Sequence, residues 1–378
     1  MNRIIFTLCL CLAINSLEAQ WSKNFTFGLK GGYEYNIYKT PYTLDSDDDF
    51  LIGSDLITSG FFEGISFRGQ FQNKFENGRL KLNFRGSANN FHTEENANLY
   101  DFGLSASYRV KYASRKYFEF APEFYRKQRA GIDLSDDILR TTLSYTQLML
   151  PLSFDFYLKD KVWLKTDIGY RFKAYDENDR GEKVSYHALF SGASLSKKWE
   201  NTTAIRKVIF SPGVEHRIYT DLEAEDREDE DSDLIEDERY WTYFSVDLEY
   251  DLNSKNNKLS YTIGLYSTLR NDVENRFSYK EFGPGAQLNF PLKKATLTLG
   301  GSYRYRSFNT VMVNESTDQL IYQYLRANAR LTVPLSKNSF WYAEGNVIRR
   351  ISNNTSIERT AFRSYNYALV ETGLSFRF

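Results

Sequence analysis

The side chains that most often carry acid–base or nucleophilic catalysis are scarce in this sequence of 378 residues. The three histidines are His92, His187 and His216, and the two cysteines, Cys9 and Cys11, both lie close to the N-terminus. None of the histidines stands in a recognisable nucleophile motif, and the spacing offers no zinc site. We therefore expect neither an enzyme nor a bound metal or cofactor.

Charged residues on alternate positions are the more informative chemistry. Near the start of the chain and towards its end, acidic and basic residues recur between apolar ones, and in a strand such positions share one face. The set comprises Lys30, Glu34, Arg304, Arg306, Arg326, Arg330, Glu344, Arg350, Arg363 and Glu371. On the wall of a water-filled pore these charges would set ion selectivity, with arginines favouring anions. In a narrow or filled lumen, neighbouring opposite charges would only satisfy one another, and the sequence leaves both interpretations open.

An acidic run is the strongest local charge feature. Its only basic residue is Arg227, and its acidic residues are Asp221, Glu223, Glu225, Asp226, Glu228, Asp229, Glu230, Asp231, Asp233, Glu236, Asp237 and Glu238. Like charges at this density repel one another and favour a solvated external loop. The alternative is that the run binds divalent cations, directly or as bridges to phosphate groups of a surface glycolipid. A smaller acidic cluster at 45–49 is predicted on the same side, but Phe50 stands where an EF-hand needs glycine.

Strands must position these charges, because the chain after its first twenty residues alternates between apolar and polar residues. Leu80, Leu82 and Phe84, for example, are separated by Lys81 and Asn83. Period-two alternation is typical of strands with one apolar and one polar face, and no stretch shows a helical period. The mean hydropathy of −0.53, with 16% aromatic residues, excludes a helical membrane protein, which needs apolar runs of about 20 residues. The fold class is therefore all-β.

The connections between the expected strands alternate strictly between short and long. Short polar turns fall near 73–79, 113–116, 159–161, 196–202, 253–258, 291–294 and 334–339, and longer loops near 39–56, 92–97, 126–139, 176–183, 221–239, 271–275, 307–319 and 352–359. This spacing predicts about 16 strands (14 is the alternative), with both termini on the short-turn side. A soluble β-sandwich would also alternate in polarity, but it would not sort its loops in this way. Because proline removes a ladder hydrogen bond, we expect bulges at some of Pro122, Pro151, Pro212 and Pro284.

The first nineteen residues have the layout of a secretory signal peptide. Arg3 supplies the positive charge, residues 4–14 form a short apolar segment, and Ala19 precedes the expected cleavage site. Removing this segment removes both cysteines, so the exported chain has no disulfide framework. We expect residues 20–378 to form a single domain.

The C-terminal segment carries a family resemblance. In residues 368–378 the apolar residues alternate with polar ones, and the chain ends with Phe376 and Phe378 on one face. This segment resembles the C-terminal strand of Gram-negative outer-membrane β-barrel proteins, in which a terminal aromatic residue is read by the barrel-assembly machinery. The resemblance implies a single closed antiparallel transmembrane β-barrel in the outer membrane, with Phe376 and Phe378 as its assembly signal. The expected contacts are then outer-membrane lipid, surface glycolipid and that machinery.

The function expected for a barrel of this size is a porin-like channel for passive diffusion of small polar or ionic solutes. The alternative is a non-conducting accessory barrel in an export, assembly or surface-attachment complex. A formal net charge of −1 gives no reason to expect nucleic acid as a partner. The solute, the oligomeric state and any protein partner are not specified by the sequence.

Overall fold

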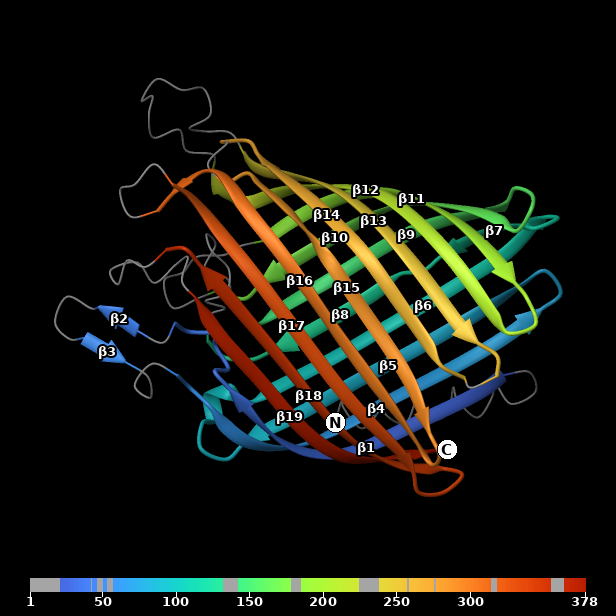
Figure 1. Ribbon diagram of the computed structural model, residues 1–378, viewed down its shortest axis with the longest axis horizontal. Coiled ribbons are helices and arrows are strands. Elements are labelled where there is room, and N and C mark those ends of the chain that lie inside the picture. Colours follow the sequence, from blue (N-terminus) through green and yellow to red (C-terminus); the bar gives the residue numbers. More distant parts are fainter. Residues whose placement is uncertain are drawn as a thin grey trace, which may run out of the picture.

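The computed structural model describes residues 21–41, 43–45, 50–52, 57–131, 142–177, 185–223, 238–256, 258–274, 277–313, 318–354 and 364–378. These residues form an all-β molecule in which tilted strands wrap into one elongated barrel (Figure 1). The predicted signal peptide, Arg363 and most of the acidic run lie outside the described residues. No helix in the described ranges is long and apolar enough to span a membrane.

The barrel wall is one antiparallel sheet that closes on itself. Its strands are β1 (Trp21–Tyr35), β4 (Gly60–Phe75), β5 (Gly78–Phe91), β6 (Leu99–Ala113), β7 (Lys116–Phe120), β8 (Glu123–Gln128), β9 (Tyr145–Tyr157), β10 (Val162–Tyr175), β11 (Ser185–Glu200), β12 (Ala204–Glu223), β13 (Glu238–Ser254), β14 (Ser260–Asp272), β15 (Tyr279–Leu292), β16 (Ala295–Met312), β17 (Gln319–Pro334), β18 (Ser339–Ser352) and β19 (Tyr365–Arg377). The short strands β7 and β8 share one place between β6 and β9, which gives sixteen places around the ring. The predicted closed antiparallel barrel of about 16 strands is confirmed.

Two small elements lie outside the wall. The hairpin of β2 (Thr43–Asp45) and β3 (Phe50–Ile52) forms a separate two-stranded sheet beyond the end of the barrel where the longer loops lie (Figure 1). The 3-10 turn η2 (Glu95–Ala97) lies in the connection between β5 and β6.

Apolar side chains cover the outside of the barrel. Leu29 is 47% exposed, Phe61 66% and Val370 62%, whereas the neighbouring strand positions Lys30 and Glu34 face the interior. Each strand is thus apolar on its outer face and polar on its inner face. A water-soluble domain has the reverse distribution, and a lipid-facing barrel requires this one.

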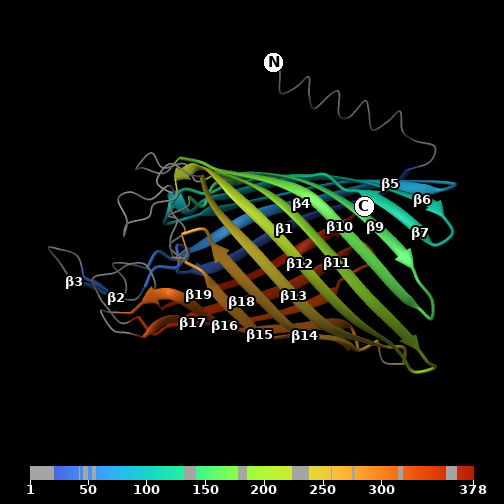
Figure 2. The same cartoon turned by 90° about the horizontal axis from the view of Figure 1, so that it is seen from above.

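The connections are sorted by length, as predicted. Short turns lie at one end of the barrel together with the C-terminus, and the longer connections lie at the other end (Figures 1 and 2). We call these the short-turn end and the loop end. All seven short turns and all eight longer loops fall at the predicted places in the chain, because polar and turn-forming residues interrupt the alternation there.

The prolines perturb the sheet less than expected. The wall strand breaks between β7 and β8 at Pro122, and there the Ala121 N–H donates to the Pro151 carbonyl at 3.1 Å. Pairing continues without a register shift past Pro151, Pro212 and Pro284, so no bulge forms at these three positions. A proline loses only one ladder hydrogen bond, and the antiparallel register tolerates that loss. The register shifts that occur lie near strand ends, in the β6–β7, β12–β13 and β16–β17 pairs.

The first and last strands of the wall form the closing seam. β1 and β19 pair from Thr26–Arg377 to Tyr35–Ala368. Beyond this ladder the Phe378 N–H donates to the Phe25 carbonyl at 2.8 Å, and the Phe25 N–H donates to the Phe378 carbonyl at 3.2 Å. The seam leaves neither strand with an open edge, which spanning hydrocarbon requires.

Packing at the seam predicts that Gly32→Ala destabilises the barrel whereas the neighbouring Gly31→Ala does not. A Cβ at Gly32 would lie 2.3 Å from the Val370 carbonyl oxygen and 2.8 Å from the Phe62 ring, while one at Gly31 would meet nothing closer than 3.5 Å. Overpacking of this kind costs about 1–3 kcal/mol. We expect the compact form of Gly32→Ala to convert to the unfolded form at a lower temperature on gel electrophoresis. Equal conversion temperatures for the two variants would contradict this account.

Candidate functional site

The inner wall of the barrel is the candidate site, and the predicted lumen charges lie on it. Residues that pair across neighbouring strands share a face, so the outward side chains Leu29 and Val370 define the inward positions. The predicted residues on inward positions are Lys30, Glu34, Arg304, Arg306, Arg326, Arg330, Glu344, Arg350 and Glu371. Arg363 lies outside the described residues.

Several of these charges pair with one another, as the interpretation of a filled lumen expects. Lys30 Nζ lies 3.5 Å from Glu371 Oε2, and Arg330 Nη1 lies 2.8 Å from Glu344 Oε2. The Tyr342 hydroxyl also donates to Glu371 at 3.0 Å. Around the seam the inner wall is therefore locally neutral.

A deeply buried ion pair lies at the loop end. Two guanidinium nitrogens of Arg129 donate to the two carboxylate oxygens of Glu34 at 3.0 and 2.8 Å, and each side chain is only 6% exposed. The Nε of Arg129 donates to the Ala97 carbonyl at 3.1 Å, and the Tyr367 hydroxyl donates to Glu34 at 3.1 Å. This pair joins the strands of the seam to the ends of two longer loops. The sequence identified Glu34 but not its partner, because Arg129 follows β8 outside the alternating pattern.

Arginines and aromatic rings form a continuous belt on the inner wall near the loop end. One arginine comes from every second strand, namely Arg217 from β12, Arg270 from β14, Arg306 from β16 and Arg350 from β18. Each guanidinium lies 4.2–5.1 Å from the centres of two rings. The rings are those of Tyr186, Trp241, Tyr243, Tyr279, Tyr322, Tyr324 and Tyr365. We call this set the arginine–aromatic belt.

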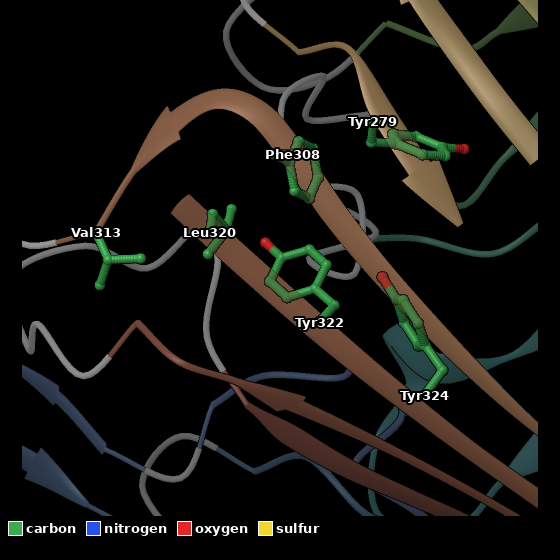
Figure 3. Close-up of a cluster of buried hydrophobic side chains, with 6 residues drawn as sticks. All are labelled: Tyr279, Phe308, Val313, Leu320, Tyr322 and Tyr324. Carbon is green, nitrogen blue, oxygen red and sulfur yellow. The ribbon is translucent and has the colours of Figure 1, made fainter. Parts of the chain in front are cut away.

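Several side chains of the belt are packed against one another and shielded from solvent. Arg270 and Arg350 are 5% and 2% exposed, and Tyr322 is fully buried. Figure 3 shows the aromatic packing on β15 to β17, where the ring of Phe308 lies 5.6 Å from that of Tyr279 and 5.4 Å from that of Tyr322. Side chains thus fill the loop end of the lumen along this part of the wall and narrow the mouth of the barrel.

Hydrogen bonds and acidic neighbours hold the belt arginines in place. Arg217 Nε lies 2.5 Å from Glu215 Oε1, and Arg306 Nη2 lies 2.8 Å from Glu281 Oε2. Arg270 Nη2 donates to the carbonyl oxygen of Phe277 at 2.7 Å. A cation held against aromatic faces keeps its charge without a full hydration shell, so the mouth has a fixed basic wall.

The middle of the lumen is open, in contrast to the narrow mouth at the loop end. Arg68 on β4, Gln287 on β15, and Arg326 and Asn328 on β17 all stand on inward positions and are all exposed. A lumen filled by side chains would bury residues at this height. Their exposure indicates a water-filled space along the inner wall.

Charge is spread unevenly around this space. β13 presents Asp247, Glu249 and Asp251 inward, and none of them has a Lys or Arg nitrogen of the described chain within 4.0 Å. Basic residues dominate the charged inward positions of β4, β5 and β6, namely Arg68, Lys74, Arg79, Lys81, Arg85, Arg109 and Lys111. Counted around the sixteen places from β1, β4 is second and β13 tenth, so the two groups face each other across the lumen.

The remaining sequence candidates lie away from the lumen or outside the described residues. Phe376 and Phe378 lie on the outer face, where Phe378 is 75% exposed and its ring lies 6.2 Å from that of Phe25. Of the acidic run, Asp221 and Glu223 belong to the end of β12, and Glu225, Asp226, Glu228, Asp229, Glu230 and Asp231 lie outside the described residues.

The described histidines show no catalytic arrangement. His216 Nδ1 lies 2.9 Å from the Thr242 hydroxyl, and His187 hydrogen-bonds the Tyr170 hydroxyl. Both histidines pair with residues of the outer face. No cluster of metal-binding side chains occurs among the residues that the structure describes.

Sequence reasoning missed much of the inner wall. The predicted lumen charges come only from β1 and the last four strands. Asp247, Glu249 and Asp251 nevertheless alternate visibly in the segment that becomes β13. Arg217 and Arg270 also stand on alternate positions of their strands, so the same parity rule would have found them. Their partners across strands follow only from the register, which alternation within one strand does not supply.

Comparisons with known proteins give only structural matches of low sequence identity. No protein-family model and no curated protein sequence matches the chain. Among solved structures, the outer-membrane channel DcaP of Acinetobacter baumannii is 12% identical with a TM-score of 0.49, over 96% of this chain and 98% of that one. OccK1 of Pseudomonas aeruginosa is 11% identical with a TM-score of 0.44, over 94% and 98%. The siderophore receptor PirA of Pseudomonas aeruginosa is 8% identical with a TM-score of 0.41, over 94% and 80%.

These similarities are too weak to carry an argument about function, and they include both a channel and a receptor. The closed antiparallel sheet with an apolar outer face is itself the architecture that the resemblance of the last strand implied.

The buried pair at the loop end predicts that Glu34→Gln is strongly destabilising, because it leaves Arg129 charged and without its carboxylate. Breaking a buried ion pair from one side costs about 3–5 kcal/mol. We expect the loss in denaturant unfolding of the detergent-folded protein. The matched control is Glu123→Gln, whose partner Arg85 lies 3.3 Å away with its side chain 52% exposed; exposed pairs contribute little. Comparable losses for the two variants would refute the assignment.

Proposed function

We propose that this protein is an outer-membrane channel through which small polar and ionic solutes diffuse passively, with a preference for anions. The observation that carries the proposal is the exposure of inward-facing polar side chains at mid-height, Arg68 and Arg326 among them, inside a closed wall whose outer face is apolar. Such a wall excludes lipid from the lumen and lets water in. A barrel of sixteen strands is wide enough for an aqueous path.

Location follows the same reasoning. The outer face suits hydrocarbon, the seam leaves no free edge, and the first nineteen residues fit an export signal. Phe376 and Phe378, on the outer face of the closing strand, suit recognition by the barrel-assembly machinery during insertion. Outer-membrane lipid then surrounds the protein, and divalent cations could bridge the acidic run, which follows β12 in the sequence, to surface glycolipid.

The preference for anions rests on the basic surfaces of the lumen. The arginine–aromatic belt lines the narrow loop end, and Arg68, Lys81 and Arg85 line a hollow of about 290 Å³ in the wall between β4 and β6. Fixed positive charge raises the local concentration of anions in a confined aqueous path. The acidic residues of β13 face this surface and orient charged solutes across the lumen.

A second candidate function is a non-conducting accessory barrel in an export, assembly or surface-attachment complex. The burial of the arginine–aromatic belt favours it, because side chains packed across the loop end narrow the mouth. A barrel closed at that end would offer its loops to a partner and pass no solute.

Conductance separates the two functions. In planar bilayers the purified protein should give stable single-channel steps, and its reversal potential in a KCl gradient should show anions to be more permeant. Arg68→Glu combined with Lys81→Glu should keep the conductance and lower the anion-to-cation permeability ratio by roughly tenfold at low salt. The effect should shrink at 1 M salt, where charges are screened within about 3 Å.

The control is Arg349→Glu, a charge reversal on the outer face that leaves the lumen unchanged. A folded protein that never conducts would support the accessory barrel. Conduction with an unchanged permeability ratio in the double variant would contradict the argument from charge.

A further inference from the structure

One row of paired inward residues crosses five neighbouring strands. Glu249 on β13 pairs with Gly264 on β14, which pairs with Gly285 on β15. Gly285 pairs with Ser302 on β16, and Ser302 pairs with Arg326 on β17. The row thus has an acid at one end, a base at the other and no side chain larger than serine between them. We call these five residues the glycine shelf.

A hollow in the wall lies along the glycine shelf, and its lining includes Gly285, Ser302 and Tyr266. A Cβ at Gly264 would lie 2.5 Å from the Tyr266 hydroxyl, and one at Gly285 would lie 3.1 Å from the same ring, so glycine lets Tyr266 lie flat against the wall. The hollow has a volume of about 400 Å³ and its lining includes Thr262, Gln287 and Asn328. This volume lies in the range of small-molecule sites, and the lining is largely polar.

The basic end of the glycine shelf is free to bind an anion. Arg326 is exposed, and within the described part of the chain no carboxylate lies within 4.0 Å of it. Arg304 stands beside it, stacked 4.2 Å from the Tyr266 ring centre. One nitrogen of Arg304 donates to the Gly283 and Pro284 carbonyls at 3.0 Å each, which fixes the guanidinium at the edge of the hollow.

The acidic end is equally available to a cation. Glu249 accepts a hydrogen bond from the Tyr266 hydroxyl at 3.1 Å, and Asp251 accepts one from Thr262 at 2.7 Å. Both donors are neutral, so they orient the carboxylates and leave their negative charge in place. Together with Asp247 these groups form an anionic edge opposite Arg326.

The separation of the two ends selects the length of a ligand. Four strand spacings of about 4.8 Å place the backbones of Glu249 and Arg326 roughly 19 Å apart along the wall. Curvature of the wall and the reach of both side chains shorten the gap between the charged groups. An extended peptide gains about 3.3 Å per residue, so it spans more of this gap than a single amino acid does.

We propose that the glycine shelf is a binding subsite for short zwitterionic peptides of two to three residues, with the peptide carboxylate at Arg326 and Arg304 and its ammonium group at Glu249. The proposal rests on the proposed function in that the subsite faces the path of the diffusing solute. It assigns to that path a class of solute that carries both a positive and a negative charge, which simple anions and simple cations do not.

Ligand-detected NMR on the detergent-folded protein tests the subsite without requiring conduction. The probes are glycine, diglycine, triglycine, N-acetyltriglycine and triglycine amide. We expect diglycine or triglycine to bind most tightly, and glycine and both capped peptides to bind at least tenfold more weakly. A protein that binds the peptides but does not conduct would leave the subsite standing and remove only the channel.

Substitutions at Arg326 and Glu249 test whether these residues bind the peptide. Arg326→Gln and Glu249→Gln should each weaken triglycine binding at least tenfold, and the charge exchange Glu249→Arg with Arg326→Glu should restore it with the peptide reversed. Arg349→Gln, on the outer face, should leave the affinity unchanged. The compact form on unheated gels confirms that each variant has folded, and the capped peptides test the unmodified protein in any case.

Three results would overturn the proposal. Glycine could bind as tightly as triglycine, which would show that the site does not select for length. N-acetyltriglycine could bind as tightly as triglycine, which would show a simple anion site. Triglycine binding could also be unaffected by Arg326→Gln and by Glu249→Gln.

Discussion

A backbone N–H or C=O group without a partner in hydrocarbon costs several kcal/mol, so a sheet that spans a bilayer cannot keep a free edge. The pairing of β1 with β19 removes that edge, and the rest of this structure depends on it. The register at the seam also matters, because a slip of one residue would place the inward side chains of one seam strand beside the outward side chains of the other. Closure of the sheet makes disulfides unnecessary in a chain whose two cysteines both lie in the predicted export signal.

Within the closed wall, two heights of the lumen use charge differently. Near the loop end, guanidinium groups are stacked on rings and buried, so they give a fixed surface whose geometry hardly depends on solvent. At mid-height, acids and bases stand on opposite walls and face water, and Arg326 has glycine and serine as its neighbours along the row. In the proposed channel, the first arrangement narrows the path and the second binds the solute.

The sequence carries enough information to predict the wall but not the contacts across it. Alternation within each segment, as at Leu80 to Phe84, predicts strand number, faces and connections, because burial on one face leaves a period of two. It also places Arg326 and Glu344 on the inner wall. It does not reveal that Glu249, Gly264, Gly285, Ser302 and Arg326 form one row, since that depends on four registers at once. Arg129 escapes prediction for a related reason: its partner Glu34 is 95 residues away, and no local pattern connects them.

The outer face opposite the arginine–aromatic belt has a consequence for where the bilayer ends. Polar side chains appear there among the apolar ones: Lys280, Ser307, Gln323, Arg349 and Asn366. An apolar band of about 25 Å cannot cover strands such as β13, whose 17 residues rise roughly 40 Å when tilted by 45°. In the proposed outer-membrane location, the narrow mouth therefore stands above the acyl chains, at the level of the headgroups or beyond. A macromolecule in the surrounding medium could therefore contact the loop end at the height of the arginine–aromatic belt without entering the membrane.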